Sequence, residues 1–205
     1  MDHRRPVMRK IGITGGVGCG KSEVMEYISA HYDAVTIRAD EVGRKLMEPD
    51  GACFDPVVAL FGTRILKADG TMDRAKIAEE VFADSDRRDA LNHIIHPAVR
   101  NYITDAMDLA RQAGHKWFFL EAALLIEEDY GAILDELWYI YAEETVRRRR
   151  LSASRGYSEE TIDSIMRNQL SEEAFRDACG FVIDNSGDFS ETAAAIDRKM
   201  RKNKR

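Results

Sequence analysis

The sequence predicts an α/β protein built on a parallel β-sheet with helices on both faces. Three observations predict it: short apolar runs without polar alternation, helical patterns between them, and a glycine-rich turn directly after the first run. Apolar runs that lack alternation indicate strands buried on both faces, and strands that alternate with helices indicate a parallel sheet. We expect five strands, at residues 10–14, 35–37, 117–120, 137–141 and 181–183.

The segment between the second and third expected strands, residues 38–116, is far longer than a bare crossover requires. Its pattern is helical, and we expect helices at residues 57–61, 75–81, 87–95 and 98–113. Turn residues at 49–51 and 69–70, together with Pro97, are expected to separate these helices. The segment therefore reads as a helical insertion into one domain.

Composition excludes several classes of protein. The 205 residues are 44% hydrophobic and 32% charged with a net charge of −6, which excludes a disordered chain. An acidic body is a poor nucleic-acid binder, and the basic end, residues 198–205, is expected to be a frayed, solvated tail. The most apolar stretch, residues 117–126, is too short to span a membrane. Three unpaired cysteines favour a reducing compartment, so we expect a cytoplasmic protein.

The glycine-rich turn fits the phosphate-loop motif G-x-x-x-x-G-K-[ST] at every fixed position. It reads Gly15-Gly16-Val17-Gly18-Cys19-Gly20-Lys21-Ser22, and all eight residues are candidates for binding a nucleotide. The motif lies between an expected strand and a helical pattern, so its amides and the helix N-terminus can hold a polyphosphate. We expect Lys21 to reach the β- and γ-phosphates and Ser22 to hold Mg²⁺ with ATP. The motif and its setting predict the P-loop NTPase fold.

The features around the loop favour a small-molecule kinase over a switch GTPase, because no N-K-x-D guanine-binding motif occurs. Such a kinase needs a carboxylate near the end of the second strand, lid arginines and an acceptor subdomain. Asp40, a basic cluster at residues 147–150 with Arg155, and the helical insertion meet these needs. We expect one domain over residues 1–205. Its parts are a nucleotide-binding core at about 8–47 and 116–205, a helical acceptor subdomain at about 48–115 and a lid at about 147–172.

Beyond the loop, further motifs in the same order make the sequence resemble the dephospho-coenzyme A kinase family. They are Ala39-Asp40-Glu41-Val42-Gly43-Arg44, Asp69-Gly70 with Asp73-Arg74, Leu91-Asn92-His93-Ile94-Ile95-His96-Pro97, Leu124-Leu125-Ile126-Glu127, Gln169 and Val182-Ile183-Asp184-Asn185-Ser186-Gly187. The resemblance covers nearly the whole chain. It implies transfer of the γ-phosphoryl group of ATP to the ribose 3′-hydroxyl of dephospho-coenzyme A, the last step of coenzyme A biosynthesis. The expected partners are therefore ATP and dephospho-coenzyme A, with Mg²⁺, for a monomer or weak homo-oligomer.

The resemblance also implies roles for single residues. Asp40 is expected to be the general base, with Arg44 and His96 at the acceptor. Arg149 and Arg155 are the expected catalytic arginines of the lid. Three further positions are assigned to the nucleotide and its metal: Asn185 to nucleotide binding, and Glu121 or Glu127 to the metal's water shell.

Each of these roles has a simpler alternative. Asp40 is also a good N-cap for a helix that begins at Glu41, and Arg44 can form an i,i+4 ion pair with it. His96 can be a packed imidazole at a helix end. Four successive arginines point in different directions around a helix, so only one or two can face one ligand.

The sequence departs from the family pattern at Arg38, where a second acidic residue is usual. A cation there can bind phosphate or change the strength of Asp40 as a base. Two alternative functions therefore stay open. One is a kinase for another small hydroxyl or a nucleoside monophosphate, and the other is a nucleotide-binding regulator with impaired catalysis.

Overall fold

The computed structural model describes residues 7–128 and 130–202. The chain divides into two compact units. One unit joins Met1–Thr36 to Ala113–Arg205 and contains most of the sheet, and the other is Ile37–Gln112 and is helical. The helical unit thus begins next to the expected insertion at 38–116, and about ten residues before the acceptor subdomain expected at about 48–115.

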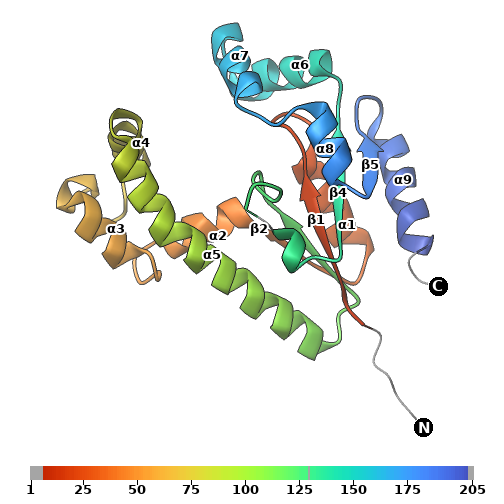
Figure 1. The fold of residues 1–205 in the computed structure, drawn as a ribbon, viewed down its shortest axis with the longest axis horizontal. Helices are drawn as coiled ribbons and strands as arrows, with labels where there is room; N and C mark the ends of the chain where they lie inside the picture. The colour runs from red at the N-terminus through yellow and green to blue at the C-terminus, as the bar shows by residue number, and fades with distance from the viewer. Residues whose placement is uncertain (1–6, 129, 203–205) are drawn as a thin grey trace. The chain divides into compact units, whose positions relative to one another are not determined.

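The sheet has five strands in the order β2-β3-β1-β4-β5 (Figure 1). Their bounds are β1 Arg9–Thr14, β2 Ala34–Arg38, β3 Trp117–Glu121, β4 Glu136–Tyr141 and β5 Phe181–Asp184. Strand β1 pairs in parallel with β3 and β4, and β4 pairs in parallel with β5. All five expected strands and the predicted fold class are confirmed.

Helices cover both faces of the sheet, and successive side chains of β4 pack alternately on one face and the other. Trp138 and Ile140 belong to a core shared with α1 (Lys21–His31) and α9 (Phe189–Lys202). Tyr139 and Tyr141 alternate with them and pack on the opposite face, where Tyr139 stacks on Phe175 of α8 (Glu172–Ala178). A strand with two apolar faces cannot alternate with polar residues, which is why it reads as a continuous apolar run.

The segment expected to form the lid contains two helices, α6 (Glu144–Arg155) and α7 (Glu159–Arg167). Helix α6 ends at Gly156 in the left-handed conformation, a common way to terminate a helix. The side chain of Ser158 accepts a hydrogen bond from the Thr161 amide and caps α7. A short 3-10 turn, η2 (Tyr130–Ala132), lies between β3 and β4.

The helical unit has a hydrophobic core of its own. Its elements are α2 (Ala39–Leu46), α3 (Phe54–Phe61), the 3-10 turn η1 (Thr63–Ile65), α4 (Arg74–Ala83) and α5 (Ser85–Ala113), whose last residue lies in the other unit. Val57, Phe61, Ile65, Ile77 and Leu91 form the centre of the core. An independent core explains why this segment separates as a compact unit.

Two expectations about where helices end are wrong. Pro97 lies inside α5 and does not end a helix there, although an internal proline removes a backbone hydrogen bond and costs about 3 kcal/mol. Packing of the helix on both sides of Pro97, through Leu91, Val99 and Ile103, offsets that cost. The basic end is not frayed as far as Lys202, because α9 continues to that residue; positions 203–205 lie outside the described residues.

Within the described part of the chain, the helices are all too short or too polar to cross a bilayer.

Candidate active site

The phosphate loop joins β1 to α1 and has a conformation that glycine makes possible. Gly20 is the N-cap of α1 and adopts φ +90°, a left-handed conformation that other residues rarely adopt. A Cβ atom at Gly20 would collide with the side-chain nitrogen of Asn185, and one at Gly16 with the guanidinium of Arg147. These two glycines therefore provide the turn and the room for side chains that pack against the loop.

Lys21, the first residue of α1, folds back over the loop. Its ammonium donates hydrogen bonds to the carbonyl oxygens of Gly15, at 2.7 Å, and Gly16, at 3.3 Å. The Cys19 amide donates to the same Gly16 carbonyl at 3.3 Å. The amino group thus lies at the loop backbone, where the motif places the lysine that contacts phosphates.

Arg147, on α6, is a second cation at the loop. Its Nε atom donates to the carbonyl of Val17 at 3.0 Å, and its Nη2 atom donates to the side-chain oxygen of Gln169 at 2.5 Å. The guanidinium also packs against Gly16. Arg147 therefore connects the phosphate loop to the segment that follows α7.

A buried network on the other side of the loop fixes its shape. The Asn185 side chain, which is fully buried, donates to the Cys19 carbonyl at 2.8 Å and accepts from the Thr192 hydroxyl at 2.8 Å. Arg150 donates to the Cys19 carbonyl at 3.5 Å and to the Asn185 carbonyl at 2.9 Å. Both polar ends of the Asn185 amide are therefore engaged within the protein, and its side chain supports the loop backbone.

The other arginines of the basic cluster point elsewhere. Arg148 lies among Glu144, Glu159 and Asp163, and hydrogen bonding to Glu144 and then to Asp163 raises the pKa of its guanidinium. Arg149 is exposed, and the Arg155 guanidinium lies 5.8 Å from the centre of the Tyr157 ring. Of the arginines in this cluster, Arg147 and Arg150 are the two that contact the loop among the described residues.

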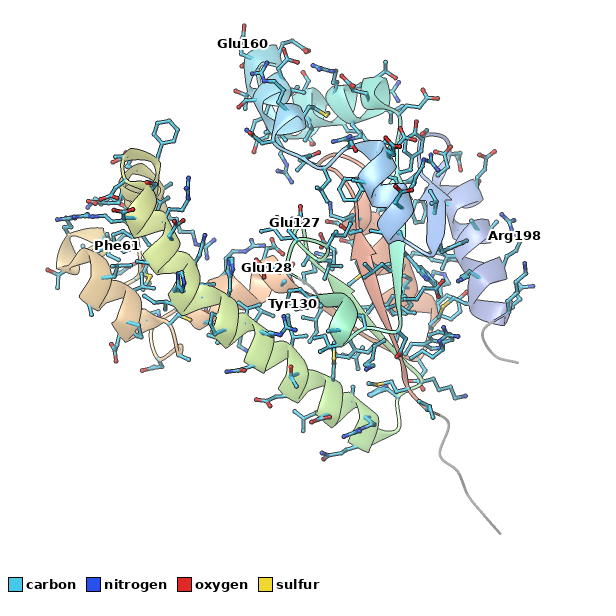
Figure 2. All side chains as sticks on the ribbon, viewed as in Figure 1. Phe61, Glu127, Glu128, Tyr130, Glu160 and Arg198 are labelled. Atoms are coloured by element: carbon cyan, nitrogen blue, oxygen red, sulfur yellow. The ribbon has the colours of Figure 1, made fainter. Side chains whose placement is uncertain are left out.

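The two candidate metal ligands of this unit lie on neighbouring segments. Ser22 is the second residue of α1, directly after the loop, and Glu121 is the last residue of β3, paired with Ile13 of β1. Glu121 is half-buried at the strand end, so its charge avoids the cost of the interior. A hydroxyl and a carboxylate are oxygen ligands of the kind that Mg²⁺ prefers. Glu127, the other candidate, is exposed on the turn after β3 (Figure 2).

In the helical unit, Asp40 and Arg44 lie on the first two turns of α2. The N-cap of this helix is Arg38, so the expectation that Asp40 caps a helix from Glu41 is wrong. The expected i,i+4 ion pair is present: Arg44 pairs with the Asp40 carboxylate and donates to the Asp40 carbonyl at 3.1 Å. Arg38 donates to Glu41 at 3.1 Å, so the unusual cation is engaged by the carboxylate next to Asp40.

His96 lies in the middle of α5 and is half-buried, so it is not the helix-end imidazole considered from the sequence. In its neighbour on the same helix face, His93, the Nδ1 atom donates a hydrogen bond to the Asp89 carbonyl at 2.7 Å. In residues 7–128 and 130–202, no cluster of three or more His, Cys, Asp or Glu side chains that could hold a metal ion is found.

Sequence reasoning missed Arg147 as a residue of the loop. The arginine run was recognised, but four consecutive arginines leave the helical phase undetermined. Gln169 belongs to the residues that carry the family resemblance, but the sequence assigns it no role. In the structure it is the side-chain partner of Arg147. The signal that could have identified Arg147 is which of the four arginines of α6 faces Gln169.

The sequence is similar to those of known proteins. Residues 9–191 match the model of the dephospho-CoA kinase family. A dephospho-CoA kinase of Corynebacterium diphtheriae is 37% identical over 180 residues, covering 88% of this chain and 90% of the relative. One from Shouchella clausii is 33% identical, covering 87% of this chain and 90% of the relative.

Solved structures show the same fold. A crystal structure of a Thermus thermophilus protein matches with a TM-score of 0.80 and 27% identity, over 95% of this chain and 97% of that one. A dephospho-CoA kinase from Campylobacter jejuni matches with a TM-score of 0.71 and 21% identity, over 96% and 97%. A shikimate kinase from Bacteroides thetaiotaomicron matches with a TM-score of 0.56 and 12% identity, over 97% and 100%. The phosphate loop, the sheet order and these matches together show that the chain is a P-loop kinase and belongs to the dephospho-CoA kinase family.

Proposed function

We propose that the protein transfers the γ-phosphoryl group of ATP to the ribose 3′-hydroxyl of dephospho-coenzyme A, giving coenzyme A and ADP. The single observation that carries the proposal is the phosphate loop, whose backbone is held by Asn185 while Lys21 and Arg147 lie on it. Amides, a helix N-terminus and two cations suit a triphosphate, which is strongly anionic. Membership of the family supplies the acceptor.

In this reaction the loop and Lys21 bind the β- and γ-phosphates. We assign to Arg147 the neutralisation of charge on the transferred group, because its guanidinium lies at the loop. The proposal gives this role to Arg147 in place of Arg149 and Arg155, the catalytic arginines predicted from the sequence, whose side chains are exposed. Ser22 and Glu121 are the residues that would hold Mg²⁺, which neutralises phosphate charge when bound with ATP. Asn185 supports the nucleotide through the Cys19 carbonyl.

Asp40 is the proposed general base, and Arg44 orients it through their ion pair. The 3′-oxygen of the acceptor forms a bond to the γ-phosphorus, the bond from that phosphorus to the β-phosphate oxygen breaks, and the hydroxyl proton passes to the Asp40 carboxylate. ADP is the leaving group. The proposal keeps His96 as an acceptor contact in the same unit and contains no phosphoenzyme.

A panel of acceptors tests the function. The purified full chain is incubated with Mg-ATP and, separately, dephospho-coenzyme A, adenosine, AMP and shikimate, and products are measured by mass spectrometry. We expect dephospho-coenzyme A to gain one phosphate group with the highest kcat/KM of the panel. A higher kcat/KM for AMP or shikimate would assign the protein to another acceptor. ATP binding without phosphorylation of any acceptor would favour the regulator.

A further inference from the structure

Arg148 of α6 is the centre of an ion-pair cluster that none of the roles above uses. Each nitrogen of its guanidinium contacts a different carboxylate: Nε contacts Glu144 at 2.8 Å, Nη1 contacts Glu159 at 3.2 Å and Nη2 contacts Asp163 at 2.7 Å. Glu144 lies on α6 itself, whereas Glu159 and Asp163 lie near the start of α7, the next helix (Figure 1). Arg148 therefore joins the two helices.

Helices α6 and α7 bury few apolar side chains. Among the described residues each helix has one buried side chain, Leu151 on α6 and Ile162 on α7. Leu151 packs against the phosphate loop, since a Cβ atom at Gly18 would lie 3.1 Å from its Cγ atom. The hydrophobic contribution scales with the apolar area removed from water, so it attaches α7 to α6 only weakly. The contacts of Arg148 with α7 therefore supply a specific attachment that apolar packing does not.

Consecutive arginines of α6 hold α7 near both of its ends. Arg148 contacts the beginning of α7. Arg147 donates at 2.5 Å to the side chain of Gln169, which lies just after the end of α7 at Arg167. Consecutive residues of an α-helix point about 100° apart, so the two arginines leave α6 in different directions. The position of α7 thus sets where Gln169 meets Arg147, and with it how the Arg147 guanidinium lies on the loop.

The geometry of the cluster suits arginine. A planar guanidinium directs N–H groups at several carboxylates at once, which a lysine ammonium on a flexible stem cannot reproduce. The Arg148 side chain is 28% exposed, and hydrogen bonding to Glu144 and then to Asp163 raises the pKa of its guanidinium. Isolated surface ion pairs contribute little, whereas several charges in one network hold their geometry better. The cluster therefore fixes the orientation of one helix on the other.

We propose that Arg148 is a positioning residue of the kinase. It attaches α7 to α6, α7 places Gln169, and Gln169 holds the guanidinium of Arg147 on the phosphate loop. Arg148 acts through Arg147 and binds no substrate itself. The inference rests on the proposed function for the part that Arg147 takes in phosphoryl transfer. It goes beyond that function because it assigns a role to a side chain outside the nucleotide and acceptor sites.

Arg148→Gln tests the proposal in the full chain with Mg-ATP and dephospho-coenzyme A. We expect kcat/KM for ATP to fall about tenfold, because misplacing a catalytic group costs up to about 10²-fold. KM for dephospho-coenzyme A should change less than about twofold. Arg148→Lys should recover part of the loss, since it keeps the charge. The control is Arg111→Gln, which should leave the rates unchanged, because Arg111 pairs at 2.9 Å with Asp108 on its own helix, α5.

The carboxylates separate the attachment of α7 from the charge around Arg148. Asp163→Asn removes a contact between the helices and should lower kcat/KM for ATP several-fold. Glu144→Gln removes a contact within α6 and should change it less than about twofold, although both substitutions remove one negative charge. A loss in Glu144→Gln as large as that in Asp163→Asn would overturn the proposal. Asp163→Asn also carries the test if Arg148→Gln does not fold.

A double-mutant cycle decides whether Arg148 acts through Arg147. In an Arg147→Ala background, Arg148→Gln should lower kcat/KM for ATP less than about twofold further, because residues that act through one network are not additive. A further loss of about tenfold in that background would show that Arg148 acts by another route. Either that result or an unchanged kcat/KM in Arg148→Gln alone overturns the proposal.

NMR spectroscopy gives a readout that does not depend on turnover. The Nε–H group of Arg147 donates to the Val17 carbonyl at 3.0 Å, so its exchange with solvent should be slow in the isotope-labelled wild-type protein. Arg148→Gln should speed this exchange, and Arg111→Gln should not. Unchanged exchange in Arg148→Gln overturns the positioning role. If the wild-type protein phosphorylates no dephospho-coenzyme A, the proposed function fails, while faster exchange in Arg148→Gln still supports the attachment of Arg147 through α7.

Discussion

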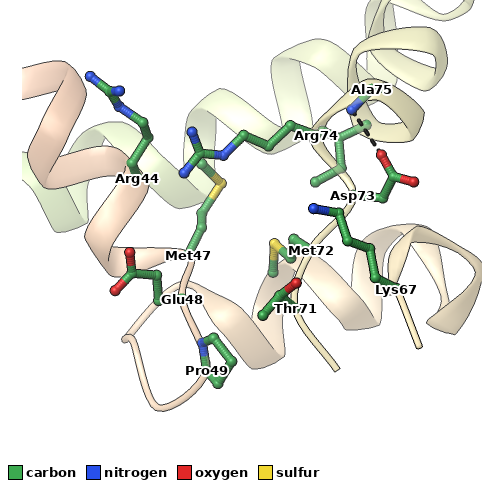
Figure 3. A pocket seen from close by; sticks show the side chains of 11 residues that line it. Arg44, Met47, Glu48, Pro49, Lys67, Thr71, Met72, Asp73, Arg74 and Ala75 are labelled. Atoms are coloured by element: carbon green, nitrogen blue, oxygen red, sulfur yellow. Dashed lines mark hydrogen bonds between the residues drawn. The ribbon is translucent and has the colours of Figure 1, made fainter. Parts of the chain in front are cut away.

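The two compact units hold their functional side chains in opposite ways. In the unit that contains the phosphate loop, Lys21, Arg147 and Asn185 are each hydrogen-bonded to a loop carbonyl, and Asn185 is fully buried. The helical unit contains a cavity of about 510 Å³ next to the ion pair of the proposed base (Figure 3). In the helical unit, the side chains of Arg74 and Lys67, which line this cavity, are exposed and have no hydrogen-bond or ion-pair partner among the described residues. The first arrangement shapes a site through the backbone before any ligand binds, whereas the second leaves charges for the ligand to pair.

The difference has a consequence for substitutions. Changes around the loop should weaken folding and nucleotide binding together, because the same hydrogen bonds serve both. Changes in the cavity should weaken acceptor binding and leave stability unchanged. Four substitutions test this contrast, with expected effects that decrease from the first to the last.

The largest effect is expected for Asp40→Asn, in the helical unit. The amide keeps the size of the side chain but cannot accept the hydroxyl proton, so kcat should fall about 10²- to 10⁴-fold. ATP affinity, measured by calorimetry, should be unchanged. Asp55→Asn is the matched control, since Asp55 is an exposed carboxylate in the first turn of α3. Turnover of Asp40→Asn near the wild-type rate would remove Asp40 as the base.

The next effect separates neighbouring arginines of α6. Arg147→Ala should lower kcat/KM for ATP about 10- to 100-fold, because it removes a charged group from the loop. Arg149→Ala should leave it within about twofold, as expected of an exposed side chain. A larger loss of kcat/KM on substitution of Arg149 or Arg155 than of Arg147 would instead support the catalytic arginines expected from the sequence.

Asn185→Ala tests whether the loop and the fold share their hydrogen bonds. The change removes the donor to the Cys19 carbonyl and the acceptor for Thr192, so the free energy of unfolding should fall by about 1–3 kcal/mol. Urea denaturation measures it, with Arg74→Gln of the cavity as the contrasting variant, for which no loss is expected. Equal stability of the two variants would contradict the contrast between the units.

The smallest effect concerns a carboxylate away from the loop. Asp197 accepts hydrogen bonds from Tyr32, at 2.5 Å, and Tyr27, at 2.9 Å, and the bond from Tyr32 is the main cause that lowers the Asp197 pKa. A carboxyl with a lowered pKa in the folded state stabilises the fold above its ordinary pKa. That stabilisation is lost as the pH falls through about 4 and below.

Asp197→Asn should therefore lower the free energy of unfolding by about 1 kcal/mol at pH 7 and flatten its decrease between about pH 5 and pH 3. Urea titrations over this range measure the slope. Tyr32→Phe should reproduce more of the effect than Tyr27→Phe. An unchanged slope in Asp197→Asn would contradict this account of the carboxyl. Kinetic constants at pH 7 should be the same as in the wild-type protein.

Features that depend on a short stretch of sequence could be predicted. The central strands read as apolar runs because they are buried on both faces, whereas all residues of the edge strand β2 are half-buried. The phosphate loop followed from a motif whose glycines and lysine lie within one short stretch of sequence. The helical unit was less predictable. The tendency of Pro97 to end a helix can be read from the local sequence. The burial of Leu91 and Val99, which lets α5 continue past Pro97, depends on tertiary packing.

The sequence predicted which types of residue form the site, but not which of them contact one another. The arginine run of α6 was recognised, yet its phase depends on how the helix docks on the loop, which placed Arg147 there. Asn185 was expected at the nucleotide, but its side chain is buried against Cys19 and Thr192. The cavity was not predicted, because Arg44, Lys67 and Arg74 lie on three separate segments whose approach depends on the core of the helical unit.

The central claim is that a triphosphate on the loop donates one phosphoryl group directly to the acceptor ribose. The most direct measurement follows the γ-phosphate of labelled ATP in the wild-type protein with dephospho-coenzyme A, and locates it in the product by phosphorus–proton NMR correlation. We predict coupling of the new phosphorus to the ribose C3′ proton and no label on the protein. Label at the 2′-hydroxyl, on the pantetheine arm or on the protein itself would contradict the account.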